Sequence, residues 1–263
     1  MDILNKNIDG GKAFDWGRTS TDYAKYRDIY PPVFFQKVAD LGLCVKGQKV
    51  LDLGTGTGVL PRCMYKYGAD WVGSDISDNQ IAQAKMLAEK DGMDINFVVS
   101  SAEDINFPDG TFDVITACQC FFYFDYDKVL PKIARLLKDG GKLVILFMAW
   151  LPDDDKIAKA SEDLVLRFNP VWTGAGYKRN PVFIPEIAKE YFDLELRDEY
   201  DLPVPFTRES WNGRMKACRG VGASLSEVEI SVWEREHMAL LNKIAEPEFE
   251  VLHHAAMAVL RKK

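Results

Sequence analysis

An acidic residue and three glycines stand together at the end of a short apolar stretch, in the sequence DLGTGTG. The apolar stretch that ends near Asp52 predicts a strand buried on both faces, as in a parallel sheet. Gly54, Gly56 and Gly58 carry no side chains, so the backbone can bend sharply there and a ligand can approach it closely. The helix expected at 59–67 would point its N-terminal amide groups at the same space. The pattern predicts a ligand site built from a strand, a turn and a helix.

A second acidic residue follows at the spacing expected of a nucleotide site. Asp75 ends another apolar stretch, about 20 residues further on, where the ribose-binding carboxylate of such a site belongs. A carboxylate suits that task because it accepts hydrogen bonds from two neighbouring hydroxyl groups at once. The strand expected at 95–99 is likewise followed by polar residues, in the sequence SAED that begins at Ser101.

The spacing of the glycines separates two families that use such a turn. Dehydrogenases use G-x-G-x-x-G, whereas this chain has D-x-G-x-G-x-G. The three stretches, in this order, resemble the motifs of class I S-adenosylmethionine-dependent methyltransferases, and the first motif is complete. The resemblance covers about residues 23–150 and implies S-adenosylmethionine as the cofactor, with Asp75 on the ribose and Ile76, Ala102 and Glu103 around the adenine. The cofactor-binding residues that it implies are Tyr26, Asp52, Gly54, Thr55, Gly56, Gly58, Asp75, Ile76, Ala102, Glu103, Cys118 and Gln119.

The first 30 residues are polar with interleaved aromatic residues, and we expect them to form a lid segment. The sequence YAKYR, from Tyr23 to Arg27, resembles a Y-x-x-Y-R element that precedes the first motif in many small-molecule methyltransferases. Tyr26 would then help to close the cofactor site, where an aromatic face can make a cation–π contact with a sulfonium. Simple packing of these rings is an equally weighted alternative.

The residues after the strand expected at 112–117 bear on the methyl acceptor. Methyltransferases that act on the amino groups of bases or on glutamine amides carry (N/D/S)-P-P-(Y/F) at this place. This chain has CQCFFYFD from Cys118 onward, without a proline. The chain therefore looks more like the small-molecule methyltransferases of the quinone and aconitate type. The His-Trp pair frequent in that group is replaced by Phe122-Tyr123, so a catalytic histidine is not expected here.

Strands and helices alternate along the first 150 residues, which predicts an α/β fold with a doubly wound, Rossmann-like sheet. We expect seven strands, of which 192–202 and 249–260 form an antiparallel edge pair, and helices at 33–41, 77–90, 128–137 and 156–168. The helices expected at 207–215 and 226–244 would form a helical cap insertion, about 203–246. The expected domains are a lid segment (1–30), a cofactor-binding core (31–150) and a C-terminal part that completes the sheet (151–263).

Catalytic and acceptor-binding residues have no motif of their own, so we select them by chemistry. His237 and Tyr123 are the candidate general bases, needed only if the acceptor must lose a proton. The pair His253-His254 is less favoured because it falls within the last expected strand. For an acidic acceptor, Arg27 and Arg214 are the predicted ligands, with Trp211 on the same helix face as Arg214; Arg219 is a further arginine that could serve.

Composition excludes several other classes of protein. The formal charge of −7 argues against a general nucleic-acid-binding protein. The five cysteines are scattered without a C-x-x-C pair, and no histidine or cysteine accompanies the acidic run at 153–155, so we expect neither a disulfide framework nor a metal site. No signal peptide or membrane-spanning stretch is apparent. The expectation is a cytoplasmic monomer or homodimer that contacts neither nucleic acid nor membrane.

Two alternative functions remain open. A nicotinamide-dependent oxidoreductase would use the same strand, turn and helix, although the glycine spacing and the Ala102-Glu103 segment argue against it. A non-catalytic S-adenosylmethionine-binding protein would keep the cofactor residues without turnover. This alternative stays open because Phe122-Tyr123 departs from the commoner pattern at that place. The identity of the cofactor that binds would distinguish a methyltransferase from the oxidoreductase. Turnover with an acceptor would distinguish it from the non-catalytic binding protein.

Overall fold

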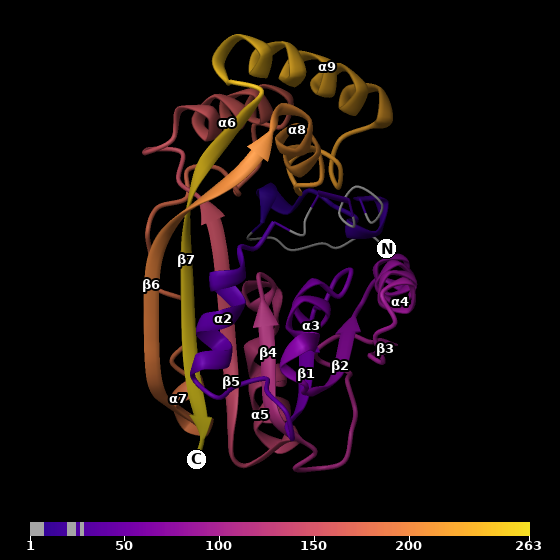
Figure 1. The fold of residues 1–263 in the computed structure, drawn as a ribbon, viewed down its shortest axis with the longest axis vertical. Coiled ribbons are helices and arrows are strands. Elements are labelled where there is room, and N and C mark those ends of the chain that lie inside the picture. The colour runs from indigo at the N-terminus through magenta and orange to yellow at the C-terminus, as the bar shows by residue number, and fades with distance from the viewer. Residues whose placement is uncertain (1–7, 20–24, 27–28) are drawn as a thin grey trace. The chain divides into compact units, whose positions relative to one another are not determined.

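The computed structural model describes residues 8–19, 25, 26 and 29–263 (Figure 1). Within these residues, seven strands form one sheet in the order β3-β2-β1-β4-β5-β7-β6. The strands are β1 (Lys49–Leu53), β2 (Asp70–Asp75), β3 (Asn96–Val99), β4 (Phe112–Cys118), β5 (Leu137–Trp150), β6 (Phe192–Thr207) and β7 (Glu248–Lys262). The α-helices are α2 (Pro32–Asp40), α3 (Val59–Met64), α4 (Asp78–Lys90), α5 (Tyr126–Leu136), α6 (Lys156–Phe168), α7 (Ala188–Tyr191), α8 (Arg208–Lys216) and α9 (Glu227–Ile244).

The first five strands of the chain are parallel where they pair, and β1 is central among them. It pairs with β2 on one side and with β4 on the other, and β2–β3 and β4–β5 continue the parallel ladder. β7 runs antiparallel between β5 and β6 and completes the edge of the sheet (Figure 1). The predicted fold, a seven-stranded α/β sheet with an antiparallel edge pair, is confirmed. Because parallel strands all end at one edge, the residues that follow β1, β2 and β4 are brought together.

The chain forms two compact units. Unit 1 comprises Met1–Tyr30, Ala149–Arg179 and Asp201–His254, and unit 2 comprises Pro31–Met148, Asn180–Tyr200 and Ala255–Lys263. The strands β5, β6 and β7 therefore contribute residues to both units. The division predicted from sequence, with boundaries after residues 30 and 150, remains a prediction.

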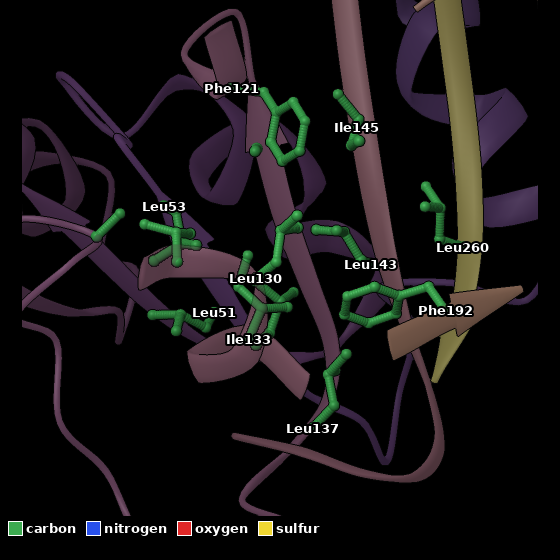
Figure 2. Close-up of a cluster of buried hydrophobic side chains, with 14 of the residues drawn as sticks. Leu51, Leu53, Phe121, Leu130, Ile133, Leu137, Leu143, Ile145, Phe192 and Leu260 are labelled. Atoms are coloured by element: carbon green, nitrogen blue, oxygen red, sulfur yellow. The ribbon is translucent and has the colours of Figure 1, made fainter. Parts of the chain in front are cut away.

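One hydrophobic cluster of unit 2 lies on one face of the parallel strands. Leu51 and Leu53 on β1 pack with Leu130 and Ile133 of α5, and Leu143 on β5 joins the same cluster (Figure 2). These side chains are at most 1% exposed. Burial of such residues stabilises the fold by roughly 1.5–3 kcal/mol for each side chain. The core therefore holds β1 and β4 firmly beneath the glycine turn.

Several helices begin at the residues that their sequence signals predict. Ser77 caps α4 by accepting a hydrogen bond from the Gln80 N–H at 3.4 Å. Asp155 caps α6, and its Oδ1 accepts from the N–H groups of Ile157 and Ala158. In α9, Ser226 and Glu229 form a reciprocal capping box. Each cap satisfies amide groups that a helix start leaves without an intrahelical partner.

Two of the expected elements differ by several residues from their predicted extent. The helix expected at 59–67 is divided into α3 and a 3₁₀ turn, Tyr65–Tyr67. The strand expected at 192–202 continues to Thr207, even though Pro203 and Pro205 lie in the continuation. β6 is an edge strand of the sheet, and prolines are tolerated there because their position needs no ladder N–H. The buried residues still alternate with exposed ones through this segment, as the strand period requires.

Candidate active site

The turn after β1 has the backbone conformation that its glycines predict. Gly54, Gly56 and Gly58 have φ values of +60°, +57° and +73°, in the left-handed region that other residues rarely adopt. A Cβ atom on Gly54 would lie 2.8 Å from both Cβ and Sγ of Cys120, and one on Gly58 would lie 2.8 Å from the Phe97 ring. A side chain at Gly54 or Gly58 is therefore excluded both by conformation and by space. The three glycines give the chain its left-handed turn at the carboxyl end of β1.

Asp75, at the end of β2, holds this turn from one side. Its Oδ2 accepts a hydrogen bond from the Gly56 N–H at 2.9 Å, and its Oδ1 accepts from the Ser77 N–H at 2.9 Å. Burial raises the pKa of Asp75, although these backbone donors counteract the rise. A carboxylate has about four lone-pair sites, so Asp75 retains capacity to accept hydrogen bonds from a ligand.

Asp52 lies beneath the turn and is buried. Its Oδ1 accepts a hydrogen bond of 2.6 Å from the Thr116 hydroxyl on β4. Burial raises the pKa of Asp52 to about 7, with the charge of Asp75 contributing, against the lowering effect of the Thr116 hydroxyl. The sequence analysis did not select Thr116. A hydroxyl residue within the otherwise apolar stretch 114–118 of β4 was the available signal.

The predicted adenine-side residues follow β2 and β3. Ile76 is 41% exposed, whereas Ala102 is buried. The carboxylate of Glu103 accepts a hydrogen bond from the Asp125 N–H at 3.0 Å, and its backbone carbonyl accepts one from the Lys132 side chain. Since Asp125 is the N-cap of α5, Glu103 holds the start of that helix, and its role toward adenine remains a prediction.

The residue that follows β4 is hydrogen-bonded to β5. Cys118 is the last residue of β4, and Gln119 follows with a φ of +67°, which is unusual for a residue other than glycine. The Gln119 N–H donates to the Leu146 carbonyl at 2.9 Å, and its side-chain amide donates to the Met148 carbonyl. These bonds fix the left-handed conformation of Gln119 and so the direction in which the chain leaves β4.

The predicted base Tyr123 lies in the same loop. It ends a 3₁₀ turn, Phe121–Tyr123, and its N–H donates to the Cys120 carbonyl at 2.9 Å. Its ring is 4.2 Å from that of Phe122, centroid to centroid, and Phe122 is 44% exposed. Tyr123 therefore lies in the loop that follows β4, and its catalytic role remains a prediction.

Comparison with known proteins identifies this strand-and-turn arrangement. The sequence profile of the family described as "Methyltransferase domain" matches residues 51–145. Residues 51–145 are similar to a class I methyltransferase domain. The methyl donor of this class is S-adenosylmethionine. The residues present fit that group, because Asp75 beside the glycine turn keeps capacity to accept hydrogen bonds from a ligand.

Individual relatives support the assignment of the domain. A demethylmenaquinone methyltransferase from Thermus thermophilus is 33% identical over 148 residues, which are 55% of this chain and 59% of the relative. UbiE from Vibrio campbellii, a ubiquinone/menaquinone biosynthesis C-methyltransferase, is 31% identical over 151 residues, which are 55% of this chain and 51% of the relative. The chain thus spans about half the length of the curated relatives it matches. The solved structure of YcgJ from Bacillus subtilis superposes with a TM-score of 0.52 at 18% identity, over 86% of this chain and 97% of YcgJ, which shows a shared fold.

All the cofactor residues predicted from sequence except Tyr26 lie in unit 2 with the methyltransferase domain. Tyr26 belongs to unit 1 and is half-buried there. Its ring packs directly on α8, since a Cβ on Gly213 would lie 2.3 Å from the ring. The predicted acceptor residue Arg27 lies outside the described residues.

The other predicted acceptor residues are interior side chains of unit 1. Trp211 is fully buried, and its Nε1–H donates to the Ser161 hydroxyl at 2.9 Å. Arg214 is 4% exposed, and its guanidinium lies 4.8 Å from the centroid of the Trp150 ring. The Trp150 Nε1–H in turn donates to Glu162 at 2.6 Å.

The predicted base His237 is also an interior residue of unit 1. It is fully buried, stacks on Trp233 at 4.6 Å between ring centroids, and has hydrogen-bond partners at both ring nitrogens. Burial lowers its pKa to about 3. These are the contacts of a packed interior histidine, so they give no support to its role as a base, which remains a prediction. His253 and His254, on β7, are likewise buried.

Among the described residues, no group of three or more His, Cys, Asp or Glu side chains is arranged to hold a metal ion. None of the helices in the described part of the chain combines the length and apolar character needed to cross a membrane.

Proposed function

We propose that this chain transfers a methyl group from S-adenosylmethionine to a small-molecule acceptor by in-line displacement. The observation that carries the proposal is the left-handed glycine turn held between two acids, Asp52 below it and Asp75 beside it. When bound, S-adenosylmethionine supplies a methyl group on a sulfonium whose leaving group is a neutral thioether. The chain's own task is then to bind, to orient and to exclude water.

Each part of unit 2 has a proposed share in that task. Asp75 accepts hydrogen bonds from the ribose hydroxyls, and Gly56, which carries no side chain, allows the ligand to come into contact with the turn. Ile76 and Ala102 offer apolar surface to the adenine. Asp52, neutral over part of the physiological pH range because of its raised pKa, supports the turn from within the core.

We propose a small-molecule acceptor because the loop after β4 has no proline and because both named relatives carry names from quinone biosynthesis. For an acidic acceptor, the proposed ligands remain Arg27, Trp211 and Arg214, with His237 or Tyr123 as a base where a hydroxyl must lose its proton. The proposal extends to a cytoplasmic monomer or homodimer without nucleic-acid or membrane partners, and to the division into lid, core and C-terminal part.

The test is calorimetric binding of S-adenosylhomocysteine to the wild type, to Asp75→Ala and to Asp70→Ala. Asp70 is the exposed acid at the opposite end of β2, so it controls for loss of a charge on that strand. We expect micromolar binding by the wild type and by Asp70→Ala, and a loss of at least tenfold in Asp75→Ala. Absence of binding by the wild type would refute the proposal.

Two further measurements separate the alternatives. Binding of NAD in place of S-adenosylhomocysteine would favour an oxidoreductase. Binding of S-adenosylhomocysteine without turnover of any quinol, phenol or carboxylate acceptor would favour a non-catalytic binding protein.

A further inference from the structure

Cys120 occupies a position that no cofactor motif includes. Its Sγ lies against the Cα of Gly54, since a Cβ built on that glycine would be 2.8 Å from both Cβ and Sγ of the cysteine. The thiol also donates a hydrogen bond to the Leu53 carbonyl, with 3.0 Å between sulfur and oxygen. The side chain therefore contacts the last residue of β1 and the first glycine of the turn at the same time.

The turn is held on its other side by β2. The Thr55 N–H donates to the Ser74 carbonyl at 2.8 Å, and the Gly56 N–H donates to Asp75 at 2.9 Å. β1 lies between β2 and β4 in the sheet, so these bonds and the Cys120 contact act from opposite sides. The turn is thus supported by β2 at residues 55 and 56 and by the loop after β4 at residue 54.

Cys120 is brought to this place by the residue before it. Gln119 adopts a left-handed conformation and is bonded to β5 through both its backbone and its side chain. This turns the chain at the end of β4, and the next side chain meets the turn after β1. Burial raises the pKa of the Cys120 thiol, with nearby Asp52 contributing, so the sulfur remains protonated and keeps its hydrogen for the Leu53 carbonyl.

We propose that Cys120 is a positioning residue for the cofactor turn, acting through Gly54 and Leu53. The inference rests on the proposed function, because it concerns binding of the same cofactor. A cysteine suits the place because its side chain fills the space over a glycine and still supplies a weak hydrogen-bond donor. A β-branched residue would press on Gly54, and alanine would leave the turn without support on the β4 side.

The experiment measures S-adenosylhomocysteine affinity and thermal unfolding for the wild type and for three substitutions of this residue. We expect Cys120→Val to weaken binding at least tenfold and Cys120→Ala about threefold or more. Cys120→Ser keeps a donor of similar size and should stay within about threefold of the wild type. The matched control is Cys218→Val, at a cysteine in unit 1 that is 5% exposed, which should lower the melting temperature and leave the affinity unchanged.

The outcomes distinguish this inference from the proposed function. If the wild type does not bind S-adenosylhomocysteine, the proposed function fails and this inference fails with it. If the wild type binds and both Cys120→Val and Cys120→Ala bind equally well, only the role of Cys120 is refuted, even if both unfold at lower temperature. If Cys120→Val does not fold, the comparison of Cys120→Ala with Cys120→Ser decides.

Discussion

The hydroxyl of Ser161 on α6 lies 2.9 Å from Nε2 of His237 on α9, and Nδ1 of the same ring lies 2.8 Å from Oδ1 of Asn212 on α8. Because Asn212 presents an oxygen to the ring, Nδ1 donates this hydrogen bond. The three residues join the helices α6, α8 and α9 of unit 1 and are at most 5% exposed. A buried network of this kind specifies how the helices pack.

Acidification should weaken the folded state through His237. Burial lowers its pKa to about 3, from 6.5 in the unfolded chain. The unfolded state therefore takes up a proton as the pH falls below 6.5, whereas the folded state does not, and stability is lost at up to about 1.4 kcal/mol per pH unit. Urea unfolding of the wild type and of His237→Gln between pH 6.5 and 4 should show the wild type's advantage shrinking; a constant difference would contradict the burial of a neutral ring.

Asp52 should make the free energy of unfolding change with pH in the direction opposite to His237, over an overlapping pH range. Its pKa is about 7 in the folded state, against 3.8 for an ordinary aspartate. As the pH rises from about 4 to 7, the unfolded state releases a proton that the folded state keeps, so stability falls. The Asp52→Asn variant lacks this loss and should gain stability relative to the wild type across that range, as measured by urea unfolding.

A companion substitution, Thr116→Val, tests the cause of the Asp52 pKa. It removes the hydroxyl that donates to Asp52, and the pKa of Asp52 should rise further. Loss of a buried donor costs about 1–3 kcal/mol, most clearly above pH 7. Equal stability of Thr116→Val and the wild type at pH 8 would show that the 2.6 Å bond contributes nothing.

The ion pair between Asp9 and Arg219 should be essential to unit 1. Arg219 donates to Asp9 through Nε at 2.7 Å and through Nη2 at 3.1 Å, and both side chains are nearly fully buried. Although burial alone would raise the pKa of Asp9, its bonds to Arg219 and Thr173 lower it overall. Arg219→Met leaves a buried carboxylate without its cation and should cost about 3–5 kcal/mol of unfolding free energy.

Two controls accompany that variant in urea unfolding. The double variant Asp9→Asn with Arg219→Met should recover part of the loss, because no charge is then left behind. Asp163→Asn, which breaks the exposed pair of Lys159 and Asp163, should cost less than about 1 kcal/mol. A loss of that small size in Arg219→Met would show that the buried pair is no more important than a surface one.

Gly58 and Gly42 allow backbone strain to be separated from loss of space. Both have left-handed φ values, +73° and +70°, so alanine should cost roughly 1–2 kcal/mol of stability at either position. Only at Gly58 would the new Cβ also meet another side chain, the ring of Phe97 at 2.8 Å, while nothing lies within 4 Å at Gly42. We expect Gly58→Ala to bind S-adenosylhomocysteine at least tenfold more weakly and Gly42→Ala to bind it like the wild type; equal affinities would be evidence against the turn as the cofactor site.

Local signals were enough to predict most of the fold and the glycine turn that we propose as the cofactor site. The helix expected at 156–168 begins at its cap Asp155 and ends as predicted, because a cap acts on amide groups within one turn. Gly54 and Gly58 are left-handed as expected, since that preference is a property of the residue itself. Asp52 and Asp75 meet at one sheet edge because consecutive parallel strands have their carboxyl ends together.

Contacts between distant segments were decided only by the tertiary structure. The sequence places no signal on Cys120 that would bring it to Gly54, since the approach depends on the turn at Gln119 and on the pairing of β4 with β1. His237 has the periodicity of a helix, but the partner helices determine whether its ring is buried or exposed, and they bury it. Periodicity and caps act over four residues or fewer, whereas burial and pKa depend on side chains 25 to 76 residues away in the chain, as Asn212 and Ser161 are from His237.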